Sequence, residues 1–176
     1  ALLLDQLLSA GIGKAVLCTG YLSGMIEDVF GDSYRGLRLV YSRETEPLGT
    51  GGAVRLALPE LDSDPVLVLN GDSCADIDLS GYLSWFFQRP RRASLLLARV
   101  PDASRFGLVE VDQTGQVGAF LEKPSIPRPG WVNAGAYILR KDLLESIPAE
   151  VNFSLEHDFF PGLAGRGLYG YCYSGM

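Results

Sequence analysis

Apolar residues in the first seventy positions alternate between helical spacing and short continuous runs. Leucines over residues 2–8 recur at helical spacing, and Gly11 is placed to end that helix. The further expected elements are a strand over 15–18, a helix over 23–30, a strand over 37–41, a loop over 43–52, a helix over 53–58 and a strand over 66–69. This β-α-β-α-β alternation predicts a parallel sheet with covering helices.

The second half of the chain adds an antiparallel pattern to this frame. Two strand-like runs, 107–111 and 117–122, flank a hairpin turn at 112–115. The other expected elements are a helix from Asp78 or Ser80 to Gln88, strands over 94–100, 131–139 and 168–173, and helices over 141–147 and 154–164. We therefore predict one α/β domain over residues 1–176, with a mixed, mostly parallel sheet and an inserted β-hairpin.

The run 66–69 is wholly apolar and stops at Asn70-Gly71-Asp72. Four such residues fit a strand buried on both faces, as in the middle of a parallel sheet. Ligands of open α/β sheets bind at the carboxyl ends of the strands, and a carboxylate there can hold a divalent metal ion. Asp72 is therefore a candidate metal ligand, the alternative being a local turn in which it caps the chain. Asp78 is expected to cap a helix.

Composition and charge narrow the class of protein. The 176 residues are 47% hydrophobic and 20% charged, with a net charge of −6, which argues against a binder of nucleic acid or of membrane surfaces. No apolar run approaches the roughly 18 residues that span a bilayer. The three cysteines, Cys18, Cys74 and Cys172, are far apart, so reduced thiols in a cytoplasmic protein are expected.

A glycine-rich stretch at 46–53 precedes one of the expected helices. Gly49, Thr50, Gly51 and Gly52 would let a ligand approach the backbone closely, next to N–H groups that the start of a helix leaves unpaired. The spacing is neither that of a P-loop nor that of a dinucleotide fingerprint. A glycine-rich turn into a helix is the alternative interpretation.

Three further motifs bring polar groups to the ends or interior of strands. Gly107 can offer bare backbone to a sugar, Glu122 can accept sugar hydroxyls, and Lys123 can pair with a phosphate, although an exposed charge pair is the alternative for the last two. Asn133 lies inside an apolar strand and needs a partner, which ligand or backbone could supply. His157, the only histidine, is expected at the surface or in packing.

In this order, the motifs 47–53, 69–72, 105–107, 122–124 and 133–135 resemble those of the sugar-1-phosphate nucleotidylyltransferases. Residues 44–53 and 153–156 look most like the D-glycero-α-D-manno-heptose 1-phosphate guanylyltransferases, with the mannose-1-phosphate guanylyltransferases close behind. The resemblance implies a Rossmann-like α/β/α nucleotidyltransferase fold. It also implies a reaction in which a sugar 1-phosphate attacks the α-phosphorus of a nucleoside triphosphate, expected to be GTP, and pyrophosphate leaves.

The same resemblance assigns roles to the candidate residues. Gly49, Thr50, Gly51 and Gly52 would lie against the nucleotide. Asp72 would hold Mg²⁺ as a catalytic residue. Gly107, Glu122 and Asn133 would contact the sugar, and Lys123 would act on its phosphate.

The chain also departs from the family pattern. The family's glycine-rich triphosphate loop would precede Ala1, and its second metal-binding aspartate would follow Met176. We therefore expect this chain alone to have negligible transferase activity, and a homodimer or edge pairing to cover exposed strands. Two alternatives stay open: thymidylyl or uridylyl transfer to glucose 1-phosphate, and a non-catalytic domain that binds sugar phosphate or nucleotide.

Overall fold

The computed structural model describes all residues except 1, 21–22, 73–77, 122–125 and 174–176. The chain divides into two compact units, each described by itself below. The first unit comprises residues 1–64 and 141–159, and the second comprises residues 65–140 and 160–176. Each unit therefore contains segments that are far apart in the sequence.

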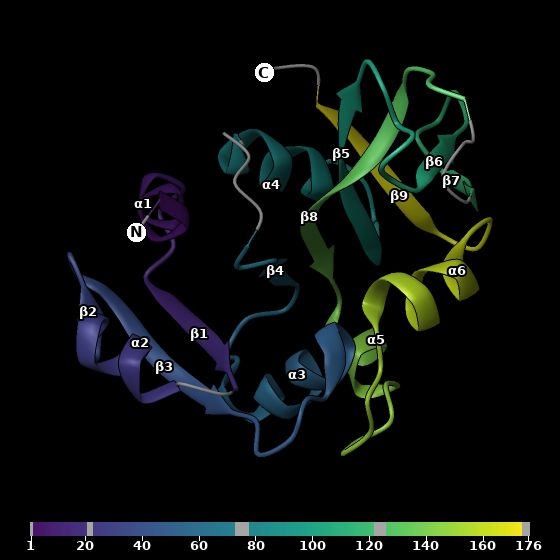
Figure 1. Ribbon diagram of the computed structural model, residues 1–176. Helices are drawn as coiled ribbons and strands as arrows, with labels where there is room; N and C mark the ends of the chain where they lie inside the picture. The colour runs from purple at the N-terminus through teal and green to yellow at the C-terminus, as the bar shows by residue number, and fades with distance from the viewer. Residues whose placement is uncertain (1, 21–22, 73–77, 122–125, 174–176) are drawn as a thin grey trace. The chain divides into compact units, whose positions relative to one another are not determined.

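The first unit contains a small sheet in the strand order β1-β3-β2 (Figure 1). Strand β1 (Lys14–Thr19) runs parallel to β3 (Leu37–Arg43), as the alternating pattern predicts, and β2 (Ser33–Tyr34) is antiparallel to β3. Helix α1 (Leu2–Ser9) packs on this sheet through a core of Leu4, Leu37 and Leu39. Helix α2 (Ser23–Phe30) has the expected bounds.

The glycine-rich stretch of the first unit belongs to a helix and not to a loop. Helix α3 spans Gly49–Ala57 and continues as a 3₁₀ turn over Leu58–Glu60, whereas the sequence predicted a loop to residue 52. Later in the chain, the unit adds α5 (Lys141–Glu145) and a π-helical turn (Leu155–Phe159). The expected loop boundary is wrong because the first turn of α3 is stabilised by a segment about 100 residues away.

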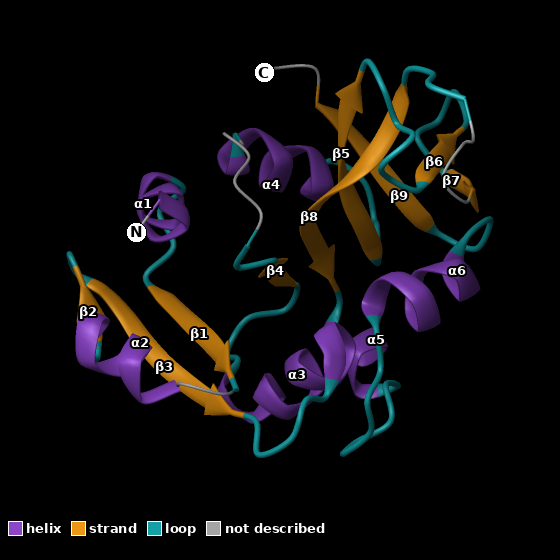
Figure 2. Ribbon diagram, viewed as in Figure 1, coloured by secondary structure: helices purple, strands orange, loops and turns teal. Residues whose placement is uncertain are grey.

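The second unit is built on a six-stranded sheet with strand order β7-β6-β8-β5-β9, and β4 pairs with β8. Its elements are β4 (Val66–Leu69), α4 (Leu79–Phe87), β5 (Ala93–Val100), β6 (Leu108–Val111), β7 (Val117–Leu121), β8 (Gly130–Leu139), α6 (Phe160–Leu163) and β9 (Leu168–Tyr173). Strands β6 and β7 form the predicted hairpin. Figure 2 shows α4 beside β5 and β9, where Tyr82 stacks on Tyr171 at 5.2 Å between ring centroids.

Two expectations about the sheet are wrong. Strand β4 pairs antiparallel with β8, from Val66 opposite Leu139 to Leu69 opposite Ala136, and does not pair within a parallel sheet among the described strands. Parallel pairing is confined to β1 with β3 and β5 with β9, so it does not predominate in the described part. The apolar run indicated a strand, but only Val66 of β4 is buried and the other three residues are half-buried. The partner strand lies about seventy residues further along the chain and sets the direction.

Helix α4 begins as the sequence predicted. Asp78 is its N-cap, and the carboxylate of Asp78 accepts a hydrogen bond of 2.9 Å from the amide of Gly81. The hydroxyl of Tyr82 lies 2.8 Å from that of Ser94 on β5, and both residues are fully buried. This contact anchors α4 on the sheet that carries the second half of the candidate site.

Candidate functional site

The start of α3 is held by the segment 151–155 of the same unit. The amides of Gly51 and Gly52 donate to the carbonyl of Phe153 at 2.8 and 3.1 Å, and the amide of Phe153 donates to the carbonyl of Leu48 at 2.8 Å. The side-chain amide of Asn152 donates to the carbonyl of Pro47 at 3.0 Å. The glycine-rich stretch is thus fixed by backbone hydrogen bonds before any ligand arrives.

Thr50 links the same two segments through its side chain. Its hydroxyl donates to the carboxylate of Glu156 at 2.6 Å and accepts from the amide of Leu155 at 2.9 Å. The hydroxyl of Ser154 donates to the same carboxylate oxygen at 3.0 Å. The two segments of the family resemblance, 44–53 and 153–156, therefore lie in direct contact in the structure.

These contacts explain why the stretch is rich in glycine. A Cβ atom at Gly49 would lie 2.8 Å from the carbonyl oxygen of Phe153, and one at Gly52 would lie 2.7 Å from the carbonyl oxygen of Val151. Gly49 also has a φ of 71°, which favours glycine. The expectation that all the early helix amides await a ligand is wrong for Gly51 and Gly52, because protein carbonyls already accept from them.

Asp72 lies in the turn that follows β4 in the second unit, and its side chain is exposed. The described residues contain no group of three or more His, Cys, Asp or Glu side chains that could hold a metal ion. A lone exposed carboxylate still suits Mg²⁺, which usually binds one or two carboxylates together with substrate phosphates. Asp72 therefore fits a metal site that is completed by phosphate oxygens.

The candidate sugar-binding residues Gly107 and Asn133 come from adjacent strands. Leu108 pairs with Leu121 of β7 on one side and with Val132 of β8 on the other. Gly107 directly precedes Leu108 and Asn133 directly follows Val132, so continuing this antiparallel pairing by one residue would bring them opposite each other. The sequence did not show this proximity, because it depends on the pairing of strands. Glu122 and Lys123, which directly follow Leu121, lie outside the described residues.

Asn133 is satisfied inside the protein. Its side-chain amide donates to the hydroxyl of Tyr137 at 2.8 Å, and its side-chain carbonyl accepts from the amide of Gly135 at 2.9 Å. What Asn133 can present to a sugar is therefore chiefly its backbone. Sequence reasoning missed Tyr137, because its burial and its contact with Asn70 arise only when β4 pairs with β8.

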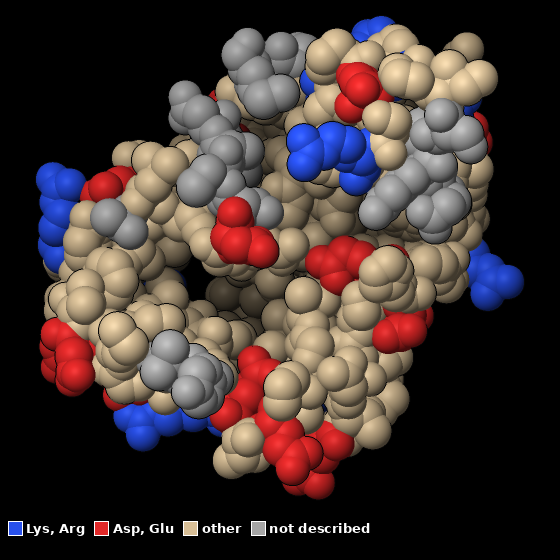
Figure 3. Space-filling model, viewed as in Figure 1, with Lys and Arg blue, Asp and Glu red and all other residues tan. Residues whose placement is uncertain are grey.

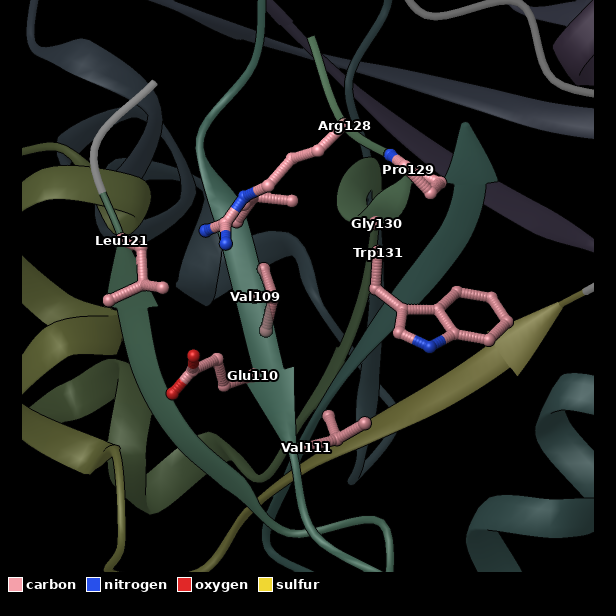
Figure 4. A pocket seen from close by; sticks show the side chains of 9 residues that line it. Val109, Glu110, Val111, Leu121, Arg128, Pro129, Gly130 and Trp131 are labelled. Carbon is pink, nitrogen blue, oxygen red and sulfur yellow. The ribbon is translucent and has the colours of Figure 1, made fainter. Parts of the chain in front are cut away.

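A pocket of about 450 Å³ opens between β6 and the start of β8, close to Gly107 in the sequence (Figure 4). Val109, Val111 and Leu121 form apolar walls, and the exposed Arg128 and Glu110 contribute opposite charges. In Figure 4 the Arg128 side chain extends across β6 towards β7, whereas the Trp131 ring points the other way. The pocket therefore places a guanidinium next to the candidate sugar-binding strands.

The surface agrees with an acidic chain that carries local basic groups. On the face seen in Figure 3, Asp and Glu side chains gather over the loops that precede α3 and follow α5, and no broad basic area appears there. No helix of the described residues is long and apolar enough to cross a membrane. Cys18 and Cys172 are both free thiols.

The described residues thus combine an α/β fold, a glycine-rich helix start in one unit and, in the other, an exposed aspartate after a strand and a separate pocket of about 450 Å³. Residues 1–160 match the family described as Nucleotidyl transferase. Because this match covers most of the sequence, the chain belongs to the nucleotidyl transferase family. The resemblance to this family and the mixed α/β fold are both confirmed.

Two of the similar proteins are guanylyltransferases of sugar phosphates. The chain is 38% identical over 175 residues to a mannose-1-phosphate guanylyltransferase of Mycobacterium tuberculosis, covering 96% of this chain and 48% of that protein. It is 36% identical over 149 residues to a D-glycero-alpha-D-manno-heptose 1-phosphate guanylyltransferase of Aneurinibacillus thermoaerophilus, covering 85% of this chain and 64% of that protein. The chain thus spans about half to two thirds of the length of these relatives.

Among solved structures, the chain resembles HddC from Yersinia pseudotuberculosis complexed with GMP-PN, with a TM-score of 0.83 and 26% identity. The match covers 97% of this chain and 74% of the HddC chain. The described residues therefore share the fold of HddC.

Proposed function

We propose that this chain forms part of an enzyme that transfers guanylyl from GTP to a mannose or heptose 1-phosphate. The observation that carries the proposal is the pairing of Leu108 with Val132, which brings the neighbouring Gly107 and Asn133 to adjacent strands, while β8 also pairs with β4, the strand that precedes Asp72. The guanylyltransferase relatives favour guanine and manno-configured sugars over the thymidylyl or uridylyl alternatives.

In the proposed reaction, an oxygen of the sugar phosphate forms a bond to the α-phosphorus of GTP. The bond from that phosphorus to the bridging oxygen breaks, and pyrophosphate leaves with the electron pair. The protein needs to supply position and charge compensation more than covalent chemistry. Nucleotidyl transferases of this kind generally use a divalent metal ion, which we propose to be Mg²⁺.

We assign the nucleotide to the first unit. Phe153 occupies the amides of Gly51 and Gly52, so the amides of Gly49 and Thr50 are the groups of this turn proposed to meet the base and ribose. The Thr50–Glu156 hydrogen bond would hold this turn in place. In this proposal, Gly51 and Gly52 let the start of α3 pack closely against residues 151–155, and this packing fixes the turn that would bind the nucleotide.

We assign the sugar phosphate and the metal ion to the second unit. Asp72 would hold Mg²⁺, which when bound would neutralise crowded phosphate charge. Gly107 and Asn133 would meet sugar hydroxyls through their backbones, Glu122 would accept from sugar hydroxyls, and Lys123 would pair with the sugar phosphate. The roles of Glu122 and Lys123 rest on the family motif alone.

Binding selectivity tests the proposal without requiring turnover. Calorimetry of the 176-residue chain with Mg²⁺ should show GTP preferred over dTTP and UTP, and mannose 1-phosphate or its heptose counterpart preferred over glucose 1-phosphate, each by about tenfold or more. A preference for dTTP or UTP with glucose 1-phosphate would support the alternative transfer. Binding of sugar phosphate that does not change with Mg²⁺ or GTP would support a non-catalytic domain.

Two further expectations belong to this proposal. We infer a cytoplasmic site of action, because the proposed nucleotide substrate is cytoplasmic and the two cysteines among the described residues, Cys18 and Cys172, are free thiols. We also infer a homodimer, because β1 pairs only with β3 among the described strands and leaves a six-residue edge. Light scattering at several protein concentrations tests the dimer, and a mass of one chain throughout would contradict it.

A further inference from the structure

The hydroxyl of Tyr137 lies where two candidate site motifs of the second unit meet. Tyr137 is fully buried in β8, opposite Val68 of β4 on one side and Leu95 of β5 on the other. Its ring is held by Phe160, at 4.8 Å between ring centroids. A side chain fixed in this way can place its hydroxyl with little freedom.

Two asparagine side chains donate to this hydroxyl. The side-chain amide of Asn133 lies 2.8 Å from it, and that of Asn70 lies 3.5 Å from it. Asn70 comes two residues before Asp72, the candidate metal ligand, and Asn133 is one of the candidate sugar-binding residues. One buried oxygen therefore connects the turn that carries the metal ligand to the strand that would hold the sugar.

Strand β8 is irregular between Asn133 and Tyr137. Strand β8 shifts register against β5, because Tyr137 pairs with Leu95 and Asn133 pairs with Leu97. Gly135 lies within the resulting bulge with a φ of 76°, its amide donates to the Asn133 side chain, and its carbonyl accepts from the Asn70 amide at 2.8 Å. Bulges of this kind commonly aim side chains near functional sites.

We propose that Tyr137 is a positioning residue that fixes the Asp72 turn and the Asn133 strand relative to each other through its hydroxyl. The proposal rests on the proposed function, since it assigns the metal ion to Asp72 and the sugar to Asn133. Tyr137 itself touches neither. Without the hydroxyl, Asn70 and Asn133 lose their shared acceptor, and the backbone hydrogen bonds between β4 and β8 alone hold the two motifs less firmly.

The variant Tyr137→Phe removes only this oxygen, and Tyr82→Phe is its matched control. Tyr82 is equally buried in the same unit, and its hydroxyl contacts Ser94 at 2.8 Å and the backbone of Ile138, whereas the two asparagine side chains contact Tyr137. Both variants should lower the melting temperature. At a temperature well below both melting points, mannose 1-phosphate measured with MnCl2 should bind Tyr137→Phe about five- to tenfold more weakly than wild type, with unchanged affinity in Tyr82→Phe.

Hydrogen exchange gives a readout that needs no ligand. The amides of Asn70 and Gly135 should exchange faster in Tyr137→Phe and at the wild-type rate in Tyr82→Phe. Unchanged exchange at these amides, or equal ligand affinity in the two variants, would overturn the proposal. If the wild-type chain binds no mannose 1-phosphate, the proposed function fails, while the exchange rates still decide whether Tyr137 couples the two motifs.

Discussion

At the scale of single residues, Thr50 connects the start of α3 to Glu156, which lies 106 positions further along the chain. Its hydroxyl both donates to a carboxylate and accepts from the backbone of the buried Leu155. A valine has nearly the same shape and lacks this hydroxyl. Thr50 therefore offers a substitution that changes hydrogen bonding and little else.

We expect Thr50→Val to lower the free energy of unfolding by about 1 kcal/mol, a typical net value for such hydrogen bonds. Urea denaturation followed by circular dichroism measures this change. Thr50→Ser retains the hydroxyl and serves as the control, expected close to wild type. Equal loss in the two variants would show that the methyl group, and not the hydroxyl, holds the helix start.

Contacts between residues that are far apart in the sequence could not be predicted from the sequence, whereas contacts within one helical turn could. The capping role of Asp78 could be predicted, because Asp78 and Gly81 lie within one helical turn. The role of Tyr137 could not, because its partner Asn70 is 67 positions away and meets it only after β4 pairs with β8. Local hydrogen bonds follow from local sequence, whereas distant ones follow from the fold.

At the scale of elements, helix α3 depends on glycines for its packing. Alanine is a better helix former than glycine by about 1 kcal/mol, so a glycine inside a helix normally weakens it. In α3 this cost is offset by the close approach of the backbone to residues 151–155. The same substitution should therefore have opposite effects in α3 and in α2.

Gly52→Ala should destabilise the protein by about 1–3 kcal/mol, because the added Cβ would lie 2.7 Å from the carbonyl oxygen of Val151. Gly24→Ala in α2 is the matched control, since no atom lies within 4 Å of its added Cβ. It should be neutral or slightly stabilising. Chemical denaturation of both variants compares them, and a neutral Gly52→Ala would contradict the packing explanation.

The β6–β7 hairpin depends on Asp112. One oxygen of its carboxylate accepts from the amide of Thr114 at 2.7 Å, the hydroxyl of Thr114 at 2.7 Å and the amide of Gln116 at 3.0 Å. These hydrogen bonds, that from the Thr114 side chain foremost, hold the pKa of Asp112 below its ordinary value of 3.8. The carboxylate therefore favours the folded state above that pH, and its contribution is lost as the pH falls through the lowered pKa.

Asp112→Ala should thus lower the melting temperature at about pH 7 and make progressively less difference as the pH falls through the lowered pKa of the wild-type carboxyl. Differential scanning calorimetry over this range measures the difference. Asp142→Ala, in the first turn of α5, serves as a comparison outside the hairpin. A constant difference between wild type and Asp112→Ala across the pH range would contradict the role given to the charge.

Element positions could be predicted from the sequence more completely than their pairing. The expected strand over 66–69 and the expected helix over 23–30 have the observed bounds. The antiparallel direction of β4 could not be predicted, because a wholly apolar run can pair equally well with a parallel or an antiparallel strand. The start of α3 at Gly49 was missed because its glycines are stabilised by tertiary contacts.

At the scale of the whole molecule, the candidate residues divide between the two units. Gly49 and Thr50 belong to the first, and Asp72, Gly107 and Asn133 to the second. The register that aligns Gly107 with Asn133 could not be read from the sequence, although both residues were predicted as candidates. Motif order thus singled out candidate site residues, which stay a prediction, and the fold shows where those within each unit lie.

Metal binding should depend on phosphate. Because no three acidic or thiol side chains gather among the described residues, Mn²⁺ alone should bind weakly, with a Kd on the order of 1 mM. Addition of GTP or mannose 1-phosphate should tighten it, and Asp72→Asn should remove this effect. Electron paramagnetic resonance of Mn²⁺ gives the bound fraction. Tight binding of Mn²⁺ without phosphate would contradict a single-carboxylate site.

The central claim is that nucleotide and sugar phosphate bind at different, identifiable parts of this chain. Nuclear magnetic resonance of the ¹⁵N-labelled chain tests it most directly, through amide shifts on addition of GTP or of mannose 1-phosphate with Mg²⁺. GTP should shift the amides of residues 49–52, and mannose 1-phosphate should shift those of Gly107, Asn133 and Gly135. Shifts confined to other residues, or none with either ligand, would contradict the account.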